Sequence, residues 1–194
     1  MRRCVFLDRD GVINEEVDYL HDPARVVLVG GAAEAIAALG RAGLAVVVVT
    51  NQAGIARGMY TERELAAVTA RIAELIAGAG GRLDATYFCP HHPEAGLGDY
   101  KIACRCRKPA PGMLERAAAE LGLDLAGSAI VGDKATDLEA GRAAGCAAVL
   151  VRSGYGAREE ARLAAAGGPP PDAVFDSLAA AAPWLLARLA GAGR

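Results

Sequence analysis

The chain has 194 residues, of which 53% are hydrophobic, and this length and composition suit one domain with a sizeable core. The formal net charge of -2 provides no basic excess to neutralise a nucleic-acid backbone, and no apolar run reaches the roughly 20 residues that span a bilayer. The N-terminal stretch reaches the acidic residue Asp8 before its apolar run is long enough for a signal peptide. We therefore expect one domain over residues 1–194, located in the cytoplasm, that binds neither nucleic acid nor membranes.

Short apolar runs alternate with Ala-rich helical patterns along the chain. In chain order we predict a strand over 3–7, a helix over 32–42, a strand over 44–49, a helix over 61–77, a strand over 85–88, an irregular polar stretch over 89–111, a helix over 112–121, a strand over 128–131, a helix over 136–144, a strand over 147–151, a turn-rich break over 167–171 and a helix over 177–189. This alternation predicts an α/β fold of three layers, with a doubly wound parallel sheet between two layers of helices.

Polar residues follow several of the predicted strands directly. Asp8 and Asp10 follow the first strand, with Gly11 to permit a bend, and Asp133 follows a later one. In proteins with parallel sheets of this kind, ligands bind beyond the carboxyl ends of the strands. Clustered acids repel one another unless a cation binds, and Mg²⁺ prefers oxygen ligands. Asp8 and Asp133 are therefore candidate Mg²⁺ ligands, although a polar turn at Asp8–Asp10 and a helix N-cap at Asp133 remain alternatives.

Two further motifs carry groups that suit phosphate. The hydroxyl of Thr50 and the amide of Asn51 follow the second strand and can donate hydrogen bonds to phosphate oxygens. Lys108 can screen the charges of a carboxylate and a phosphate, and Arg107 can bind a second oxyanion through two donors. Taken alone, these motifs also fit an ordinary turn and a solvated basic pair. Asp137 lies four residues after Asp133, where it can orient backbone groups or a nearby lysine.

A cluster of soft metal ligands lies in the irregular stretch, over about residues 89–106. Its members are Cys89, His91, Cys104 and Cys106. Three thiolates and one imidazole suit tetrahedral zinc, and a set without a position for water indicates a structural ion. We expect zinc to fix this loop, which carries Arg107 and Lys108 directly after it. The alternative is that these cysteines are small buried hydrophobic residues.

The order of these motifs resembles that of the haloacid-dehalogenase-like (HAD) phosphatases. The matching residues are Asp8-Arg9-Asp10, Thr50, Lys108 and Gly132-Asp133-Lys134-Ala135-Thr136-Asp137. The resemblance implies a Rossmann-like core without a large cap domain. It also implies catalytic roles: Asp8 as the nucleophile that forms an aspartyl-phosphate, and Asp10 as the acid and base. Thr50 and Lys108 would stabilise the phosphoryl group, and Mg²⁺ would be held by Asp8, Asp133 and the main-chain carbonyl of Asp10.

The stretches 47–58, 89–93 and 106–109 are similar to those of the branch of this family that acts on heptose bisphosphates. This closer resemblance implies removal of the C7 phosphate of D-glycero-D-manno-heptose 1,7-bisphosphate, in nucleotide-sugar synthesis for cell-surface glycans, by a monomer. The substrate-binding residues that it implies are Arg9, Glu16, Val17, Asp18, Tyr19, Asn51, Gln52, Ala53, Arg107 and Lys134. A histidinol-phosphate phosphatase shares the motifs and stays the alternative enzyme. A zinc-bound binding module with an inactive core is the alternative from another class.

Overall fold

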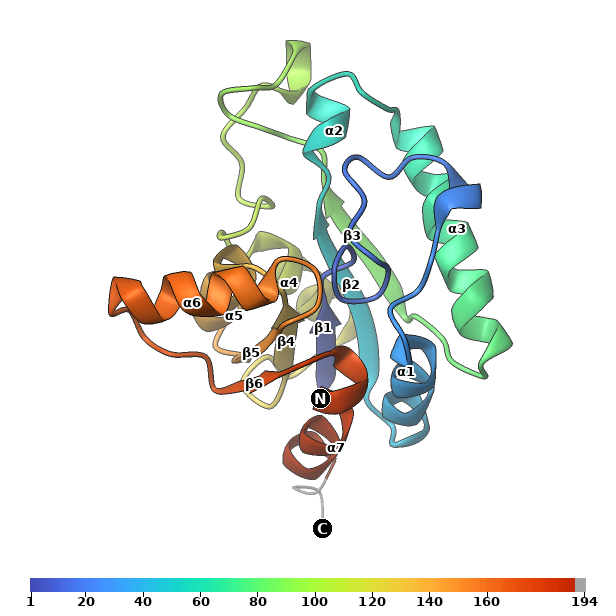
Figure 1. The fold of residues 1–194 in the computed structure, drawn as a ribbon, viewed down its shortest axis with the longest axis vertical. Helices are drawn as coiled ribbons and strands as arrows, with labels where there is room; N and C mark the ends of the chain where they lie inside the picture. The colour runs from blue at the N-terminus through green and yellow to red at the C-terminus, as the bar shows by residue number, and fades with distance from the viewer. Residues whose placement is uncertain (191–194) are drawn as a thin grey trace.

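Six parallel strands form the centre of the computed structural model, which describes residues 1–190 (Figure 1). The spatial order is β3-β2-β1-β4-β5-β6. The strands are β1 (Cys4–Leu7), β2 (Ala45–Asn51), β3 (Ala85–Cys89), β4 (Ala129–Gly132), β5 (Ala147–Val151) and β6 (Ala173–Phe175). Leu7 is in register with Val48 of β2 and with Val131 of β4. The residues that follow these three strands therefore meet at one edge of the sheet.

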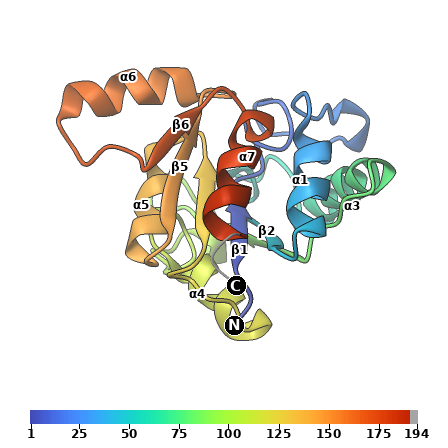
Figure 2. The same ribbon diagram turned by 90° about the horizontal axis from the view of Figure 1, so that it is seen from below.

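Helices cover both faces of the sheet, which confirms the predicted three-layer architecture (Figure 2). The helices are α1 (Ala32–Arg41), α2 (Ala53–Ala56), α3 (Glu62–Gly78), α4 (Gly112–Leu121), α5 (Ala135–Ala143), α6 (Gly156–Ala166) and α7 (Leu178–Leu189). One core joins α1, α3 and α7 to the sheet, and the other joins α4 and α5 to its opposite face. Val5 belongs to the first core and Phe6 to the second, because successive strand side chains point to opposite faces.

Local sequence signals explain the principal elements. Ala45–Asn51 forms an interior strand, between β3 and β1, because its apolar residues are buried on both faces. Thr61 begins α3 with a capping box: its hydroxyl accepts from Glu64 N at 3.2 Å, and Glu64 Oε2 accepts from Thr61 N at 2.7 Å. The sequence prediction omitted α2, α6 and β6. These elements are short or expose most of their residues, so their periodic signal is weak.

Two irregular segments lie at the edge where the strands end. Residues 8–31 connect β1 to α1, and their one helical element is a 3-10 turn, η1 (Pro23–Arg25), which contacts α3. Residues 90–111 connect β3 to α4 and contain η2 (Gly98–Tyr100). Neither segment forms a folded cap in the described part of the chain. Among the helices of residues 1–190, none combines the length and apolarity that a membrane span needs.

Helix α5 packs so closely on β4 that Gly141 has no room for a side chain. A Cβ there would lie 2.2 Å from Ile130 Cγ2, whereas Gly40 of α1 has nothing within 4 Å. We expect Gly141→Ala to lower the free energy of unfolding by about 1–3 kcal/mol through overpacking. Gly40→Ala should raise it by about 0.5–1 kcal/mol, because Ala favours helix. Urea unfolding of both variants checks the prediction, and two shifts of the same sign would contradict it.

Candidate active site

A polar cavity of about 280 Å³ opens at the carboxyl ends of β1 and β2. It brings together most of the residues that the sequence analysis selected. These are Asp8, Arg9, Asp10, Glu16, Val17, Asp18, Tyr19, Thr50, Asn51, Gln52, Ala53, Lys108 and Lys134. The cavity also contains residues that the sequence analysis did not select as site residues. These are Leu20, Gly54, Tyr60, Thr136, Asp137 and Tyr155.

Lys108 lies at the base of the cavity between two acids. Its Nζ is 3.0 Å from Asp8 Oδ1 and 2.6 Å from Asp137 Oδ1, and it donates to Val49 O at 2.7 Å. Burial opposes the charge of Lys108, but the neighbouring charges of Asp137 and Asp8 prevail and raise its pKa. The ammonium is therefore a fixed positive charge that screens Asp8. Asp137 also accepts from Lys134 N at 3.0 Å, so it orients a backbone group, as its spacing suggested.

Asp133 adds a third buried acid beside Asp8 and Asp137. Oxygen atoms of the three carboxylates lie within 4.8 Å of one another. Asp133 Oδ2 accepts from Tyr155 N at 2.9 Å, but Oδ1 is buried without a hydrogen-bond partner among the described residues. Burial, together with the charge of Asp8, raises the pKa of Asp133 to about 7. A buried carboxylate oxygen without a donor, in a set of hard oxygen ligands, fits a divalent cation such as Mg²⁺.

The Asp133 carboxylate fits into its position because two neighbouring residues are glycines. Gly11 and Gly154 have φ values of 82° and 61°, which favour glycine. A Cβ on either residue would lie 2.3 Å from Asp133 Oδ2. The loops after β1 and β5 can therefore both close around this carboxylate only because these residues lack side chains.

Asp10 does not point its carboxylate into the acid cluster. Arg9 Nη2 binds both of its oxygens at 2.9 Å, Asn14 Nδ2 donates to Oδ1 at 3.0 Å, and Gln52 Nε2 donates to Oδ2 at 3.0 Å. Burial opposes ionisation, but the charge of Arg9 and these hydrogen bonds lower the pKa of Asp10. The side chain is thus held as a carboxylate apart from the other acids. The contact of Asp10 with Mg²⁺ through its main-chain carbonyl stays a prediction.

The segment after β1 forms one wall of the cavity. Glu16 Oε2 lies 3.3 Å from Lys134 Nζ, and the ring of Tyr155 lies on the same ammonium, 4.6 Å from Nζ to the centroid. Burial opposes the charge of Lys134, but Asp133, Asp8 and Glu16 raise its pKa. Lys134 therefore offers a second cation at the cavity wall.

Several of the residues expected at the substrate have internal partners, and Asn51 and Arg107 are examples. Asn51 Oδ1 accepts from Lys108 N at 3.0 Å and Asn51 Nδ2 donates to Lys108 O at 3.0 Å, so this side chain fixes the loop that carries Lys108. Arg107 does not line the cavity, and its Nη1 donates to His91 O at 3.1 Å. The substrate contact of Arg107 stays a prediction.

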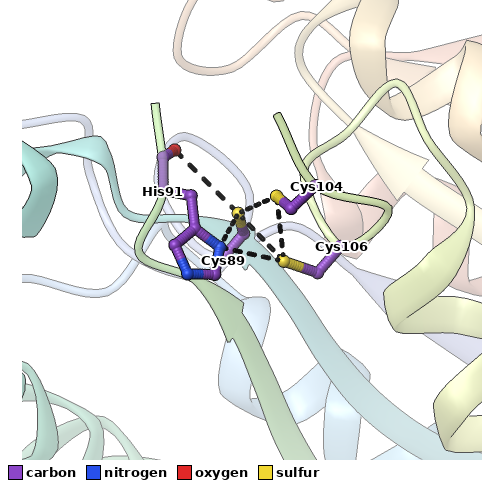
Figure 3. Close-up of side chains that lie close together, drawn as sticks. All are labelled: Cys89, His91, Cys104 and Cys106. Atoms are coloured by element: carbon purple, nitrogen blue, oxygen red, sulfur yellow. Dashed lines mark hydrogen bonds between the residues drawn. The ribbon is translucent and has the colours of Figure 1, made fainter. Parts of the chain in front are cut away.

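The four predicted soft ligands converge near the end of β3 (Figure 3). The Sγ atom of Cys106 lies 3.3 Å from that of Cys89 and 3.2 Å from that of Cys104, and 3.4 Å from His91 Nδ1. Figure 3 shows the sulfur atoms and the imidazole pointing toward one another, from the end of β3 and from the loop that follows it. Four ligand atoms at these separations can hold one metal ion. Arg107 and Lys108 follow Cys106 directly, so such an ion would fix the segment that enters the cavity.

Comparisons with known proteins agree with this geometry. Residues 105–181 match the family model described as HAD-hydrolase-like. The D-glycero-beta-D-manno-heptose-1,7-bisphosphate 7-phosphatase of Vibrio cholerae is 48% identical over 152 residues, which are 78% of this chain and 82% of the relative. The protein of that name from Pseudomonas aeruginosa is 44% identical over 188 residues, 95% of this chain and 98% of the relative.

Solved structures give the same result. The D,D-heptose 1,7-bisphosphate phosphatase of B. bronchiseptica, complexed with magnesium and phosphate, superposes with a TM-score of 0.83 at 40% identity and covers 95% of this chain and 98% of its own. The corresponding phosphatase of Burkholderia thailandensis has a TM-score of 0.70 at 36% identity, over 95% and 99% of the two chains. Because relatives this similar extend over nearly the whole length, the chain belongs to the HAD-like phosphatase family.

Proposed function

We propose that the protein removes the C7 phosphate of D-glycero-D-manno-heptose 1,7-bisphosphate, with Asp8 as the nucleophile. The observation that carries the chemistry is the Lys108 ammonium between Asp8 and Asp137, with Asp133 close by. The names of the relatives support the heptose substrate over histidinol phosphate. We propose that the protein acts in the cytoplasm, where nucleotide sugars are made, and a monomeric state stays a prediction.

The first chemical step uses Asp8 and Asp10. An oxygen of Asp8 attacks the phosphorus atom, the bond from phosphorus to the sugar oxygen breaks, and Asp10 gives the leaving oxygen a proton. Asp10 is a carboxylate in the free protein, so it must take up this proton from the solvent when substrate binds. The negative charge of a bound phosphate favours that, because it offsets the nearby charge of Arg9. Lys108 offsets the charge of Asp8 and of the approaching phosphate.

The second step reverses the role of Asp10. Once the sugar has left, Asp10 is again a carboxylate, and it takes a proton from the water molecule that attacks the phosphorus of the aspartyl-phosphate. Inorganic phosphate leaves and Asp8 is restored. Asp8, Asp133 and the main-chain carbonyl of Asp10 would hold Mg²⁺, which when bound neutralises charge on the phosphoryl oxygens.

The walls of the cavity suggest how the sugar is selected. Glu16 and Asp18 bring carboxylates that can accept hydrogen bonds from sugar hydroxyls, and Val17 and Tyr19 bring apolar surface between them. Lys134, held by Glu16 and Tyr155, is a suitable cation for the second phosphate. Histidinol phosphate lacks both the second phosphate and the row of hydroxyls, so it would leave these groups without partners.

Steady-state kinetics on both substrates test the proposed function. We expect kcat/KM for the heptose bisphosphate to exceed that for histidinol phosphate by about 100-fold or more, because unpaired polar groups in the site penalise the wrong substrate. Asp8→Asn should lose turnover of both, while Asp99→Asn, outside the cavity, should match the wild type. Faster turnover of histidinol phosphate would reject the heptose assignment.

The raised pKa of Asp133 makes Mg²⁺ binding depend on pH. This carboxyl titrates at about 7, so at pH 6 a proton competes with the cation, and at pH 8 the carboxylate is free to bind. Without metal, ionisation of this buried acid lowers the stability as the pH rises from the ordinary pKa of 3.8 to about 7. We therefore expect Mg²⁺ to raise the melting temperature more at pH 8 than at pH 6, as measured by thermal unfolding with and without Mg²⁺. Asp133→Asn should abolish the difference, and equal shifts in the wild type would contradict it.

We also propose that Cys89, His91, Cys104 and Cys106 bind structural zinc, which suits three thiolates and one imidazole. Cys104→Ser should lower the bound zinc and the melting temperature before it weakens Mg²⁺ affinity, because the cluster lies outside the acid site. Cys146→Ser is the matched control: Cys146 is buried elsewhere, so zinc content should not change. Metal analysis with thermal melting measures both. Wild-type protein that is fully stable without zinc would contradict the proposal.

A further inference from the structure

The side chain of Gln52 joins three residues at the cavity floor. Its Nε2 donates to Asp10 Oδ2 at 3.0 Å and to Thr50 Oγ1 at 2.8 Å, and its Oε1 accepts from the hydroxyl of Tyr60. Gln52 is only 3% exposed and Tyr60 only 6%. Both ends of the Gln52 amide are therefore occupied by the protein, although the residue was expected at the substrate.

Hydrogen-bond chemistry allows only one direction through this chain. The carboxylate of Asp10 can only accept, so the end of Gln52 that faces it must be the NH₂ group. The oxygen end then faces Tyr60, whose hydroxyl must donate. Burial raises the pKa of Tyr60 to about 12, so this hydroxyl keeps its proton at any working pH. Asp10 thus determines which way the Gln52 amide points, and the Tyr60 hydroxyl holds it there by donating to the oxygen end.

The orientation of Gln52 in turn fixes two catalytic groups. Its two N–H bonds are divided between Asp10 and Thr50, one to each. Because the Thr50 oxygen accepts from Gln52, the proton of the Thr50 hydroxyl points elsewhere and is free to be donated to a phosphoryl oxygen. A reversed amide would place its oxygen against the Asp10 carboxylate and would draw the Thr50 proton toward itself.

The surrounding backbone is shaped to admit the Tyr60 ring. A Cβ on Gly54 would lie 2.1 Å from Tyr60 Cε1, so a glycine is required for this close approach. The ring packs with Ile55 and Leu65 in a small core of its own, and this packing holds the hydroxyl in place.

We propose that Tyr60 is a positioning residue whose hydroxyl fixes the Gln52 amide and, through it, the catalytic hydrogen bonds of Thr50 and Asp10. The inference rests on the proposed phosphatase activity, in which Thr50 binds the phosphoryl group and Asp10 transfers the proton. It assigns to Tyr60 a role that requires no contact with the substrate.

Tyr60→Phe tests the inference because it removes the hydroxyl and keeps the ring. We expect kcat to fall roughly tenfold, the loss typical of a modest misplacement of catalytic groups, while KM changes less than about twofold. Tyr100→Phe is the matched control: this ring packs against the same small core, but its hydroxyl donates to Glu62, away from Asp10. Its kcat should equal that of the wild type.

A double-mutant cycle with Gln52→Leu separates positioning from general stability. If Tyr60 acts through Gln52, Gln52→Leu should lose at least as much kcat as Tyr60→Phe, and the double variant should lose no more than Gln52→Leu alone. Multiplied losses, or a wild-type kcat in either single variant, would overturn the inference and leave the proposed function intact. A wild-type protein that hydrolyses no phosphomonoester would instead overturn the proposed function, and the inference with it.

Discussion

The ion pairs of one buried lysine organise the site. Lys108 is 3% exposed and bridges Asp8 and Asp137, two acids that would otherwise repel each other in a region shielded from water. A buried charge is stable only when it is paired and hydrogen-bonded, and Lys108 satisfies this with two carboxylates and the carbonyl of Val49. The same charge that stabilises the apo arrangement is available to a phosphate. In the proposed mechanism, the stability of the site and its reaction with phosphate therefore both depend on the Lys108 ammonium group.

The position of this ammonium depends on Asn51, which is far away in the sequence, and on the cysteine cluster. Asn51 at the end of β2 binds both backbone groups of Lys108, and the cysteine cluster lies directly before it in the chain. The loop that carries Lys108 has little regular structure of its own between β3 and α4. A metal ion and one asparagine can supply the rigidity that a helix or strand would supply elsewhere. This would explain how an irregular segment can place the Lys108 ammonium accurately.

Sequence patterns predicted the core of the fold because its strands are continuous apolar runs and its main helices bury apolar residues along one face. They omitted α6, where Gly156 is the only buried residue, and β6, a strand of three half-buried residues at the sheet edge. For the site, Asp8, Thr50 and Asp133 were selected because they end or directly follow strands, whereas the catalytic role of Lys108, in an irregular loop, was implied by the family resemblance. Tyr60 gave no such signal: it stands just before the Thr61 cap, and its packing on Leu65 matches an ordinary hydrophobic staple. Its hydroxyl contact depends on tertiary structure alone.

The parallel order of the strands has a consequence for folding. Asp8 follows β1, Lys108 enters after β3 and Asp137 lies on α5 after β4, so the acid–lysine cluster joins parts of the chain that are about a hundred residues apart. No early portion of a newly synthesised chain contains the complete set. A partly folded molecule would therefore hydrolyse no phosphate esters, and hydrolysis begins only when the central strands have come together.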